Sequence, residues 1–423
     1  MYQKHILKNG VRVVIEEIPH AHSAVIGLWV RTGSRYENDR NRGVSHFIEH
    51  LLFKGTANRT AKQIAEELEV LGGSLNAFTA KEYTCFYARV LGEHLPKAVD
   101  LITDMFFHSN FAPEDIEKER KVILEEIKMY EDSPEELIHD LFATTVWQKH
   151  SLGYPILGTT DSVQGINEEI IRDYFQKYYT PERVVIAVAG KVRSEEILPM
   201  LEERYGDWQP NERKENAGEK PIAHAEVVFN EKDTEQVHLC IGTPGLAQND
   251  ARMYAMMILN NIIGGGLSSR LFQEIREERG LVYSIYSYHA SYQDTGLFTI
   301  YAGTSPSNVM EVIELILKEL RRVKTVSITK QELFKTKEQI KGNILLSMES
   351  ISHRMSRLGR TETCFGRVIT GEEIVAGIKG TKLDDVLQLA GDLFQKNQLT
   401  MTSIGPFDKF YNLDEVREAI QIL

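Results

Sequence analysis

The chain has 423 residues, more than one ordinary hydrophobic core accommodates, so we expect two or three domains. Hydrophobic residues make up 42% and charged residues 26%, which is typical of a globular protein. The net charge of -12 argues against nucleic acid or an anionic membrane as partner. Three widely spaced cysteines argue against a disulfide framework. Without an apolar run of signal or membrane-spanning length, a cytoplasmic protein is expected.

The first predicted elements are two strands, at residues 11–15 and 23–31, separated by turn residues. A helix is expected next, closed by Gly55. Its apolar residues recur at helical spacing, and they are Val44, Phe47, Ile48, Leu51 and Leu52. This pattern predicts a core helix with one buried side.

Three side chains on this predicted helix suit a metal ion. His46 and His50 are four positions apart and Glu49 is three from His46, so all three lie on neighbouring turns of one face. Two imidazoles one turn apart can bind the same zinc ion, and a carboxylate beside them can act as a general base. The alternative is two histidines that bond backbone groups on a half-buried helix. The zinc hypothesis requires a third ligand.

A later helix, expected over residues 113–130, supplies candidates for that ligand. Between the two helices we expect a helix at 60–71 with Thr60 as its N-cap, a strand at 83–90 and a helix at 96–108. Glu119 and Glu126 are seven positions apart and therefore lie on one side of the later helix. An acidic pair on a helix is most often a solvated face, so spacing alone does not identify a ligand.

The order His46-x-x-Glu49-His50 followed by Glu126 resembles the inverzincin metallopeptidases of the pitrilysin type. This family also contains insulin-degrading enzyme, the mitochondrial processing peptidase and bacterial two-domain members similar to processing proteases. Further segments resemble the family from about residue 11 to residue 287, and they are residues 74–79, 153–159, 179–190 and 264–272 with Arg276 and Tyr283.

The resemblance implies a set of site residues and one Zn²⁺ per chain. His46, His50 and Glu126 would be the zinc ligands, and Glu49 would be the general base. Glu119 would orient a ligand, although it can equally be a plain surface carboxylate.

The resemblance also implies residues that contact substrate. Asn76, Ala77 and Phe78 would lie on an edge strand that binds a peptide as an added strand, unless that strand is fully paired within the sheet. Arg276 and Tyr283 would contact substrate near the zinc, with Tyr283 as a donor to the oxyanion. The alternative for this pair is a helix-surface arginine and a core tyrosine.

The chain divides at a polar segment bracketed by prolines. We predict a catalytic zinc domain at residues 1–210, a linker at 211–221 and a second, homologous domain at 222–423. Placing Gly242, at the end of the predicted strand at 237–242, on Gly33 aligns the two halves. The metal-helix motif then falls on apolar residues, which are Ala255, Ile258 and Leu259. The fold class expected is α+β, with two domains that each pack helices on a mainly antiparallel sheet.

A zinc-dependent endopeptidase that acts on peptides or unfolded segments inside a closed chamber is the function that the resemblance implies. Because the chain has half the domains of the insulin-degrading type, we expect a homodimer in which the zinc helix of one subunit faces Arg276 and Tyr283 of the other. The alternatives are a non-catalytic core or scaffold subunit of the same fold, and a thiol lyase that uses a Cys ligand.

Overall fold

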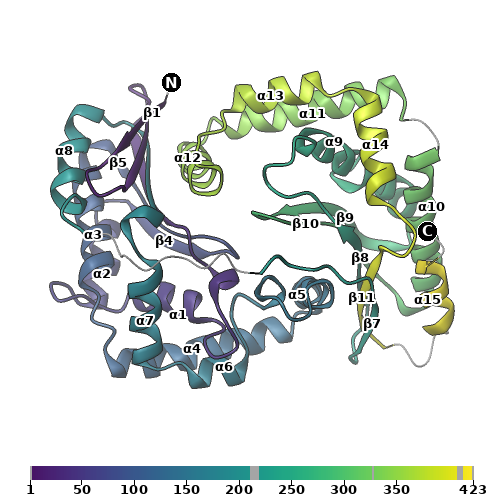
Figure 1. The fold of residues 1–423 in the computed structure, drawn as a ribbon, viewed down its shortest axis with the longest axis horizontal. Helices are drawn as coiled ribbons and strands as arrows, with labels where there is room; N and C mark the ends of the chain where they lie inside the picture. Colours follow the sequence, from purple (N-terminus) through teal and green to yellow (C-terminus); the bar gives the residue numbers. More distant parts are fainter. Residues whose placement is uncertain (1, 210–218, 326–327, 407–412, 422–423) are drawn as a thin grey trace. The chain divides into compact units, whose positions relative to one another are not determined.

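The computed structural model describes residues 2–209, 219–325, 328–406 and 413–421 (Figure 1). The chain forms two compact units, and each one combines segments from both halves of the sequence. Unit 1 comprises Met1–Met129, Tyr154–Gly218 and Leu346–Thr370. Unit 2 comprises Tyr130–Gly153, Glu219–Leu345 and Gly371–Leu423.

Unit 1 contains a six-stranded sheet in the order β1-β2-β6-β3-β5-β4. Its strands are β1 (Tyr2–Ile6), β2 (Arg12–Glu17), β3 (Ser23–Val30), β4 (Ser74–Thr79), β5 (Thr84–Leu91) and β6 (Val184–Gly190). The β2 and β6 pair is parallel, and the other pairs are antiparallel. The strand β4 lies at one end of this order and pairs with β5, and no other strand of the described residues pairs with its second edge.

Helices cover both faces of this sheet. Alternate residues of β6 therefore enter two different cores. Val184, Ile186 and Val188 pack in the larger core, whereas Val185, Ala187 and Ala189 face the other side. The helices from the first half of the chain are α1 (Val44–Leu51), α2 (Ala61–Glu69), α3 (Leu95–His108), α4 (Pro113–Glu131), α6 (Thr160–Gly165), α7 (Glu168–Tyr178) and α8 (Ser194–Tyr205). Residues of these helices fill the larger core.

The second face of the unit 1 sheet is covered by a helix from the other half of the sequence, α12 (Ile351–Phe365) (Figure 1). Met355 and Leu358 of α12 pack in the same cluster as Trp29 of β3. The Trp29 indole Nε1 donates a hydrogen bond to Met355 Sδ at 3.4 Å.

Unit 2 repeats the arrangement of five strands of unit 1, in the order β7-β11-β8-β10-β9. The strands are β7 (Val227–Glu231), β8 (Val237–Pro244), β9 (Val282–Ser291), β10 (Gly296–Thr304) and β11 (Thr400–Gly405). The parallel pair β7 and β11 corresponds to β2 and β6, and the edge strand β9 corresponds to β4. The predicted α+β fold with two similar domains is therefore confirmed.

A reciprocal exchange of helices completes unit 2. One face of its sheet carries helices from the second half of the chain, which are α9 (Met253–Gly264), α10 (Val309–Thr325), α11 (Lys330–Ser347), α13 (Gly371–Gly380), α14 (Leu383–Leu393) and α15 (Leu413–Gln421). The other face is covered by α5 (Pro134–Val146), whose Phe142 packs in one cluster with Cys240 of β8.

The compact units therefore differ from the predicted boundaries of 1–210 and 222–423. Residues 130–153 join unit 2, and residues 346–370 join unit 1. Each sheet needs a second apolar layer, and this layer comes from a helix distant in sequence. Of the predicted linker at 211–221, residues 211–218 lie outside the described part of the chain.

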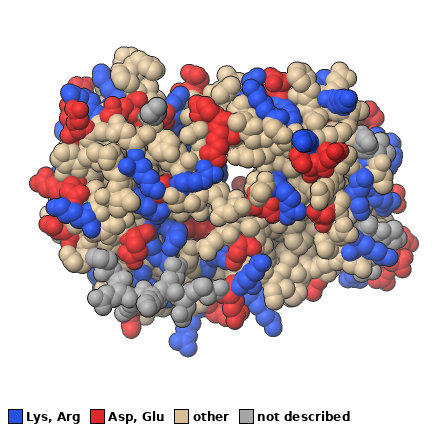
Figure 2. All heavy atoms as spheres, turned by 45° about the horizontal axis from the view of Figure 1, so that its top comes forward, with Lys and Arg blue, Asp and Glu red and all other residues tan. Residues whose placement is uncertain are grey.

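The surface carries both signs of charge. Figure 2 shows acidic and basic side chains interspersed on one face of the molecule, without a continuous area of one sign. In the described part of the chain, no helix is both long and apolar enough to cross a bilayer.

Candidate metal centre

The metal helix α1 is fixed in the core of unit 1 by its apolar side. Val44, Phe47, Ile48 and Leu51 are buried, in agreement with the predicted spacing. The helix ends at Leu51, four residues before the predicted end. The next amides bond three residues back, from Phe53 to His50 and from Lys54 to Leu51, so the chain turns more tightly than an α-helix before it reaches Gly55.

A buried carboxylate caps the start of this helix. Glu37 accepts the N–H groups of Gly43 and Ser45, at 2.7 and 2.9 Å. These amides belong to the first turn, where N–H groups have no partner within the helix. Gly43 has a φ of +90°, and a side chain there would collide with the carbonyl oxygen of Leu157. Both features fix the direction in which α1 leaves the preceding loop.

The structure brings His46, His50 and Glu126 together. His46 Nε2 lies 3.8 Å from Glu126 Oε2, and His50 Nε2 lies 3.7 Å from the same oxygen. One donor atom from each residue lies within 4.8 Å of the other two. In the part of the chain that the structure describes, this is the one group of His, Cys, Asp or Glu with such geometry.

The donor set fits zinc. With bonds of about 2.0–2.2 Å, neighbouring ligand atoms of a tetrahedral zinc ion are roughly 3.3–3.5 Å apart, close to the separations seen here. Two nitrogens and one carboxylate oxygen are donors that zinc prefers, and three protein ligands leave a fourth position free. Burial, with a smaller contribution from His50, lowers the pKa of His46 to about 3, so its imidazole is neutral and its lone pair is available near neutral pH.

Glu119 lies behind one of these ligands. Its Oε2 is 3.1 Å from His50 Nδ1, the nitrogen opposite the one that faces Glu126. Its Oε1 is 2.9 Å from the ammonium group of Lys54, three residues after the metal helix. A carboxylate that accepts the Nδ1 proton leaves Nε2 of the ring as the metal donor. Lys54 thereby holds the carboxylate that contacts His50.

Glu49 projects from the same helix and is held by a residue of β4. Its Oε2 accepts a 2.6 Å hydrogen bond from the Thr79 hydroxyl, at the end of β4. Burial raises the pKa of Glu49, and the Thr79 hydrogen bond and the nearby His50 offset part of this rise. A carboxylate with a raised pKa accepts a proton more readily, as a general base at neutral pH must.

The predicted substrate residues Asn76, Ala77 and Phe78 lie on β4, whose open edge is available for another strand. Phe78 is 36% exposed and makes an edge contact with Trp29. The Ala77 N–H is bonded to the Asn76 side-chain oxygen at 2.8 Å. A peptide that uses this N–H therefore has to displace the Asn76 amide.

Arg276 and Tyr283 lie together in unit 2. Arg276 is in a single π-helical turn, Phe272–Glu277, and its guanidinium lies 4.7 Å from the Phe272 ring centre and 5.8 Å from that of Tyr283. Tyr283 is on the edge strand β9 and is 78% exposed, so it is not the core tyrosine of the alternative interpretation.

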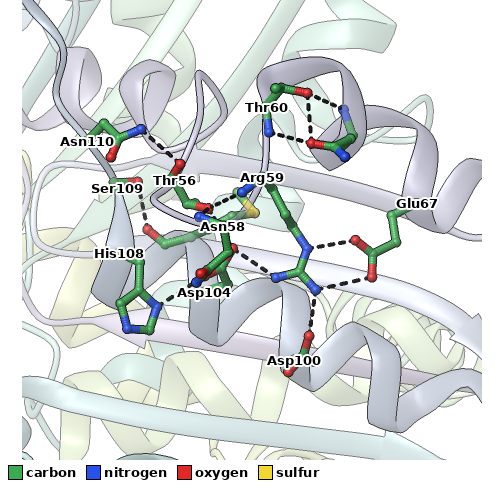
Figure 3. Close-up of polar contacts among 12 residues, drawn as sticks. Thr56, Asn58, Arg59, Thr60, Glu67, Asp100, Asp104, His108, Ser109 and Asn110 are labelled. Atoms are coloured by element: carbon green, nitrogen blue, oxygen red, sulfur yellow. Dashed lines mark hydrogen bonds and ion pairs between the residues drawn. The ribbon is translucent and has the colours of Figure 1, made fainter.

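The loop that follows the metal helix is fixed by a network of charged groups (Figure 3). The Arg59 guanidinium lies between Glu67 of α2 and Asp100 and Asp104 of α3, with separations of 2.5–2.8 Å. Asp104 also accepts hydrogen bonds from Thr56 and Asn58 of the loop. The network ties the chain after α1 to two helices and so limits movement of the helix end.

Among the described residues of unit 2, no corresponding centre is found. The helix α9, which follows β8 as α1 follows β3, carries buried Ala255, Ile258 and Leu259 at the aligned positions. None of these side chains can bind a metal ion.

Two residues of the site were not predicted from the sequence, Lys54 and Thr79. Lys54 is four positions after His50, a spacing that on the predicted helix, which was expected to extend to Gly55, would place it one turn further on the side of His50. Thr79 adjoins the predicted substrate residues, but strand periodicity does not show that its hydroxyl points to α1.

Two similar α+β units, of which the first carries this donor set on an inverted His-x-x-Glu-His helix, define a class of two-domain metalloprotein. Comparison with family profiles also divides the chain into two domains of one family. Residues 12–160 match the family described as insulinase (peptidase family M16), and residues 165–340 match the peptidase M16 inactive domain. The chain belongs to peptidase family M16.

Several relatives align over nearly the whole chain. An uncharacterized zinc protease of Bacillus subtilis is 45% identical over 397 residues, which cover 94% of this chain and 97% of that protein. An uncharacterized zinc protease of Streptomyces coelicolor is 41% identical, with 95% and 88% covered. A protease of Helicobacter pylori has the same fold, with a TM-score of 0.89 at 22% identity over 96% of this chain and 99% of its own.

Proposed function

We propose that this protein is a zinc-dependent endopeptidase that hydrolyses peptides or unfolded segments. The observation that carries the proposal is the convergence of His46, His50 and Glu126, with Glu49 on the same helix. The names of the relatives, zinc proteases, support the same activity.

The chain's own residues perform most of the proposed reaction. His46, His50 and Glu126 would hold the zinc ion, which supplies Lewis acidity for the attacking water and the scissile carbonyl. Glu49 takes a proton from the water as its oxygen attacks the carbonyl carbon. Glu49 then delivers that proton to the amine nitrogen as the C–N bond breaks. The open edge of β4 would hold the peptide as an added antiparallel strand through main-chain hydrogen bonds.

The substitution Glu49→Gln tests the assignment. The amide keeps the size of the side chain but cannot accept a proton, so zinc content should stay near one ion per chain while cleavage of an unstructured peptide is lost. Metal analysis and a fluorogenic peptide assay measure the two properties, with chelator treatment of the wild type as a parallel control. Substantial turnover by the variant would refute the role of Glu49.

A non-catalytic scaffold subunit is the alternative function. The complete donor set and the Glu49–Thr79 contact favour the enzyme, because neither is needed to build the fold. A wild-type protein that binds zinc but cleaves no peptide from a diverse library would favour the scaffold instead.

We further propose a homodimer in which Arg276 and Tyr283 of one subunit complete the zinc site of the other. The exposed Tyr283 ring and the exposed Leu267 and Phe334 of unit 2 support this proposal, because exposed apolar side chains are typical of interaction sites. Among its described residues, unit 2 also has no metal-ligand group of its own.

Co-expression of Glu49→Gln with Arg276→Ala tests this arrangement. Sites shared between subunits leave one intact site in each mixed dimer, and so about half the wild-type activity. Sites confined to one chain leave none. An inactive mixed dimer, with each parent variant inactive and zinc retained, would contradict a shared site.

A further inference from the structure

We propose that Thr79 positions the general base Glu49 and couples it to the strand that binds substrate. The inference rests on the proposed function, in which Glu49 accepts the proton. Its basis is the 2.6 Å hydrogen bond from Thr79 Oγ1 to Glu49 Oε2. This bond joins the last residue of β4 to the metal helix.

The donor has a fixed position. Thr79 pairs with Thr84 of β5, and the Ala80 N–H donates to the Tyr83 carbonyl at 2.8 Å to close the turn between the strands. The side chain is half-buried and β-branched, which restricts rotation about its first side-chain bond. The hydroxyl is therefore aimed at α1 by the backbone of the sheet.

Thr79 holds one oxygen of the Glu49 carboxylate and leaves the other available. Thr79 occupies Glu49 Oε2, and none of the described hydrogen bonds or ion pairs engages Oε1. A hydroxyl bonded to a carboxylate at this distance is a strong, charge-assisted contact. It holds the carboxylate in one orientation, so that Oε1 remains available to accept a proton from water.

The consequence is that one strand, β4, positions both the peptide and the general base. A peptide added to the edge of β4 takes its register from the same strand whose last residue holds Glu49. Binding therefore aligns the scissile bond with the base, and a misplacement of about 1 Å in such a group costs roughly 100-fold in rate. Thr79 does not react; its hydroxyl keeps its proton throughout.

The test compares Thr79→Val, which removes the hydroxyl at nearly constant shape, with Thr79→Ser, which keeps it. Thr79→Val should lower kcat about 10- to 100-fold with KM within about twofold, because the backbone of β4 is unchanged. Thr79→Ser should stay within about threefold of the wild type. Zinc content should be unaffected, and a crystal structure of the valine variant should show the Glu49 carboxylate turned from its wild-type orientation.

The matched control is Thr402→Val on β11 of unit 2, which also loses one hydroxyl hydrogen bond, to Thr145, and should retain the wild-type kcat. If Thr79→Val does not fold, Thr79→Ala removes the same hydroxyl without branching. A wild-type kcat in the hydroxyl-free variant, a change confined to KM, or equal losses in the valine and serine variants would each overturn the inference alone. A wild-type protein that cleaves no peptide would overturn the proposed function and this inference with it.

Discussion

At the scale of single residues, His50 is held by a chain of two charges. The Lys54 ammonium contacts one oxygen of Glu119, and the other oxygen faces His50 Nδ1. Glu119 is almost fully buried, whereas the Lys54 side chain is 35% exposed. The lysine lies against the buried carboxylate, and a carboxylate in this position can set the orientation of the ring.

The first prediction concerns zinc affinity. Glu119→Gln should weaken zinc binding about 10- to 100-fold, because an amide is a poorer acceptor for the His50 ring proton. Lys54→Met should weaken it less, since Glu119 keeps its contact with the ring. Competition with a coloured chelator measures both, and Lys62→Met, an exposed lysine of α2 paired with Glu66, is the control. Unchanged affinity in Glu119→Gln would exclude the orienting role.

The second prediction concerns pH and the cap of α1. Burial raises the pKa of Glu37 from an ordinary value of 4.5 to about 7, against the effect of the two amide hydrogen bonds. The folded state then binds a proton more tightly than the unfolded state. The contribution of Glu37 to the free energy of unfolding is therefore fully present below about pH 4.5 and is lost as the pH rises through 7.

Glu37→Gln, which does not titrate, isolates this effect. Between pH 4.5 and pH 8 the unfolding free energy of the wild type should fall by roughly 3 kcal/mol relative to that of the variant. Urea unfolding at several pH values measures the difference. Parallel pH profiles for the two proteins would mean that folding does not change the pKa of Glu37.

At the scale of elements, α12 approaches the unit 1 sheet closely. A Cβ atom on Gly359 of α12 would lie 2.0 Å from the Trp29 indole nitrogen, and one on Gly27 of β3 would lie 2.4 Å from Met355 Sδ. Charged contacts flank this apolar contact, from Arg354 to Glu16 and from Arg12 to Glu362. The two glycines therefore allow helix and sheet to meet around a large ring.

The third prediction uses two glycines in helices. Gly359→Ala should destabilise the protein by about 1–3 kcal/mol, because the methyl group forces Trp29 or α12 to move. Gly342→Ala in α11 has no atom within 4 Å of the added carbon, so it should be neutral or stabilise by up to about 1 kcal/mol. Thermal unfolding measures both. Similar effects of the two substitutions would show that helix propensity, rather than packing against Trp29, governs the result.

At the scale of the whole molecule, the two sequence halves exchange helices. The face of the unit 1 sheet around Trp29 is covered by residues 346–370, and the corresponding face of the unit 2 sheet by residues 130–153. Each half of the chain therefore lacks one layer of the core that it forms.

The fourth prediction is that a cut between residues 209 and 219 leaves the two pieces associated. Each piece keeps its exchanged helix packed on the sheet of the other, so they should elute together in size-exclusion chromatography. The piece 1–209 expressed alone should expose the face around Trp29 and bind a hydrophobic dye. Independent, folded pieces that separate after cleavage would contradict this picture.

Much of the architecture follows from local patterns in the sequence. The strands predicted at 11–15 and 23–31, the helical spacing of Val44 to Leu51 and the N-cap at Thr60 depend on residues close in the chain, and the structure contains each of them. The apolar residues of α9 at the aligned positions likewise follow from the internal repeat. The boundaries of the compact units do not follow from local patterns. The helices that complete each sheet lie more than 100 residues from much of the sheet they cover.

The sequence by itself determined the chemical types at the centre. His46, Glu49 and His50 share one helix face because of helix geometry, and the resemblance to a known family selected Glu126 from the acidic residues of α4. Only the tertiary structure decided which groups hold them, because the contacts of Lys54 with Glu119 and of Thr79 with Glu49 join separate elements. Hydrogen bonds of this kind depend on where a strand edge and a helix side meet, and no local spacing specifies that.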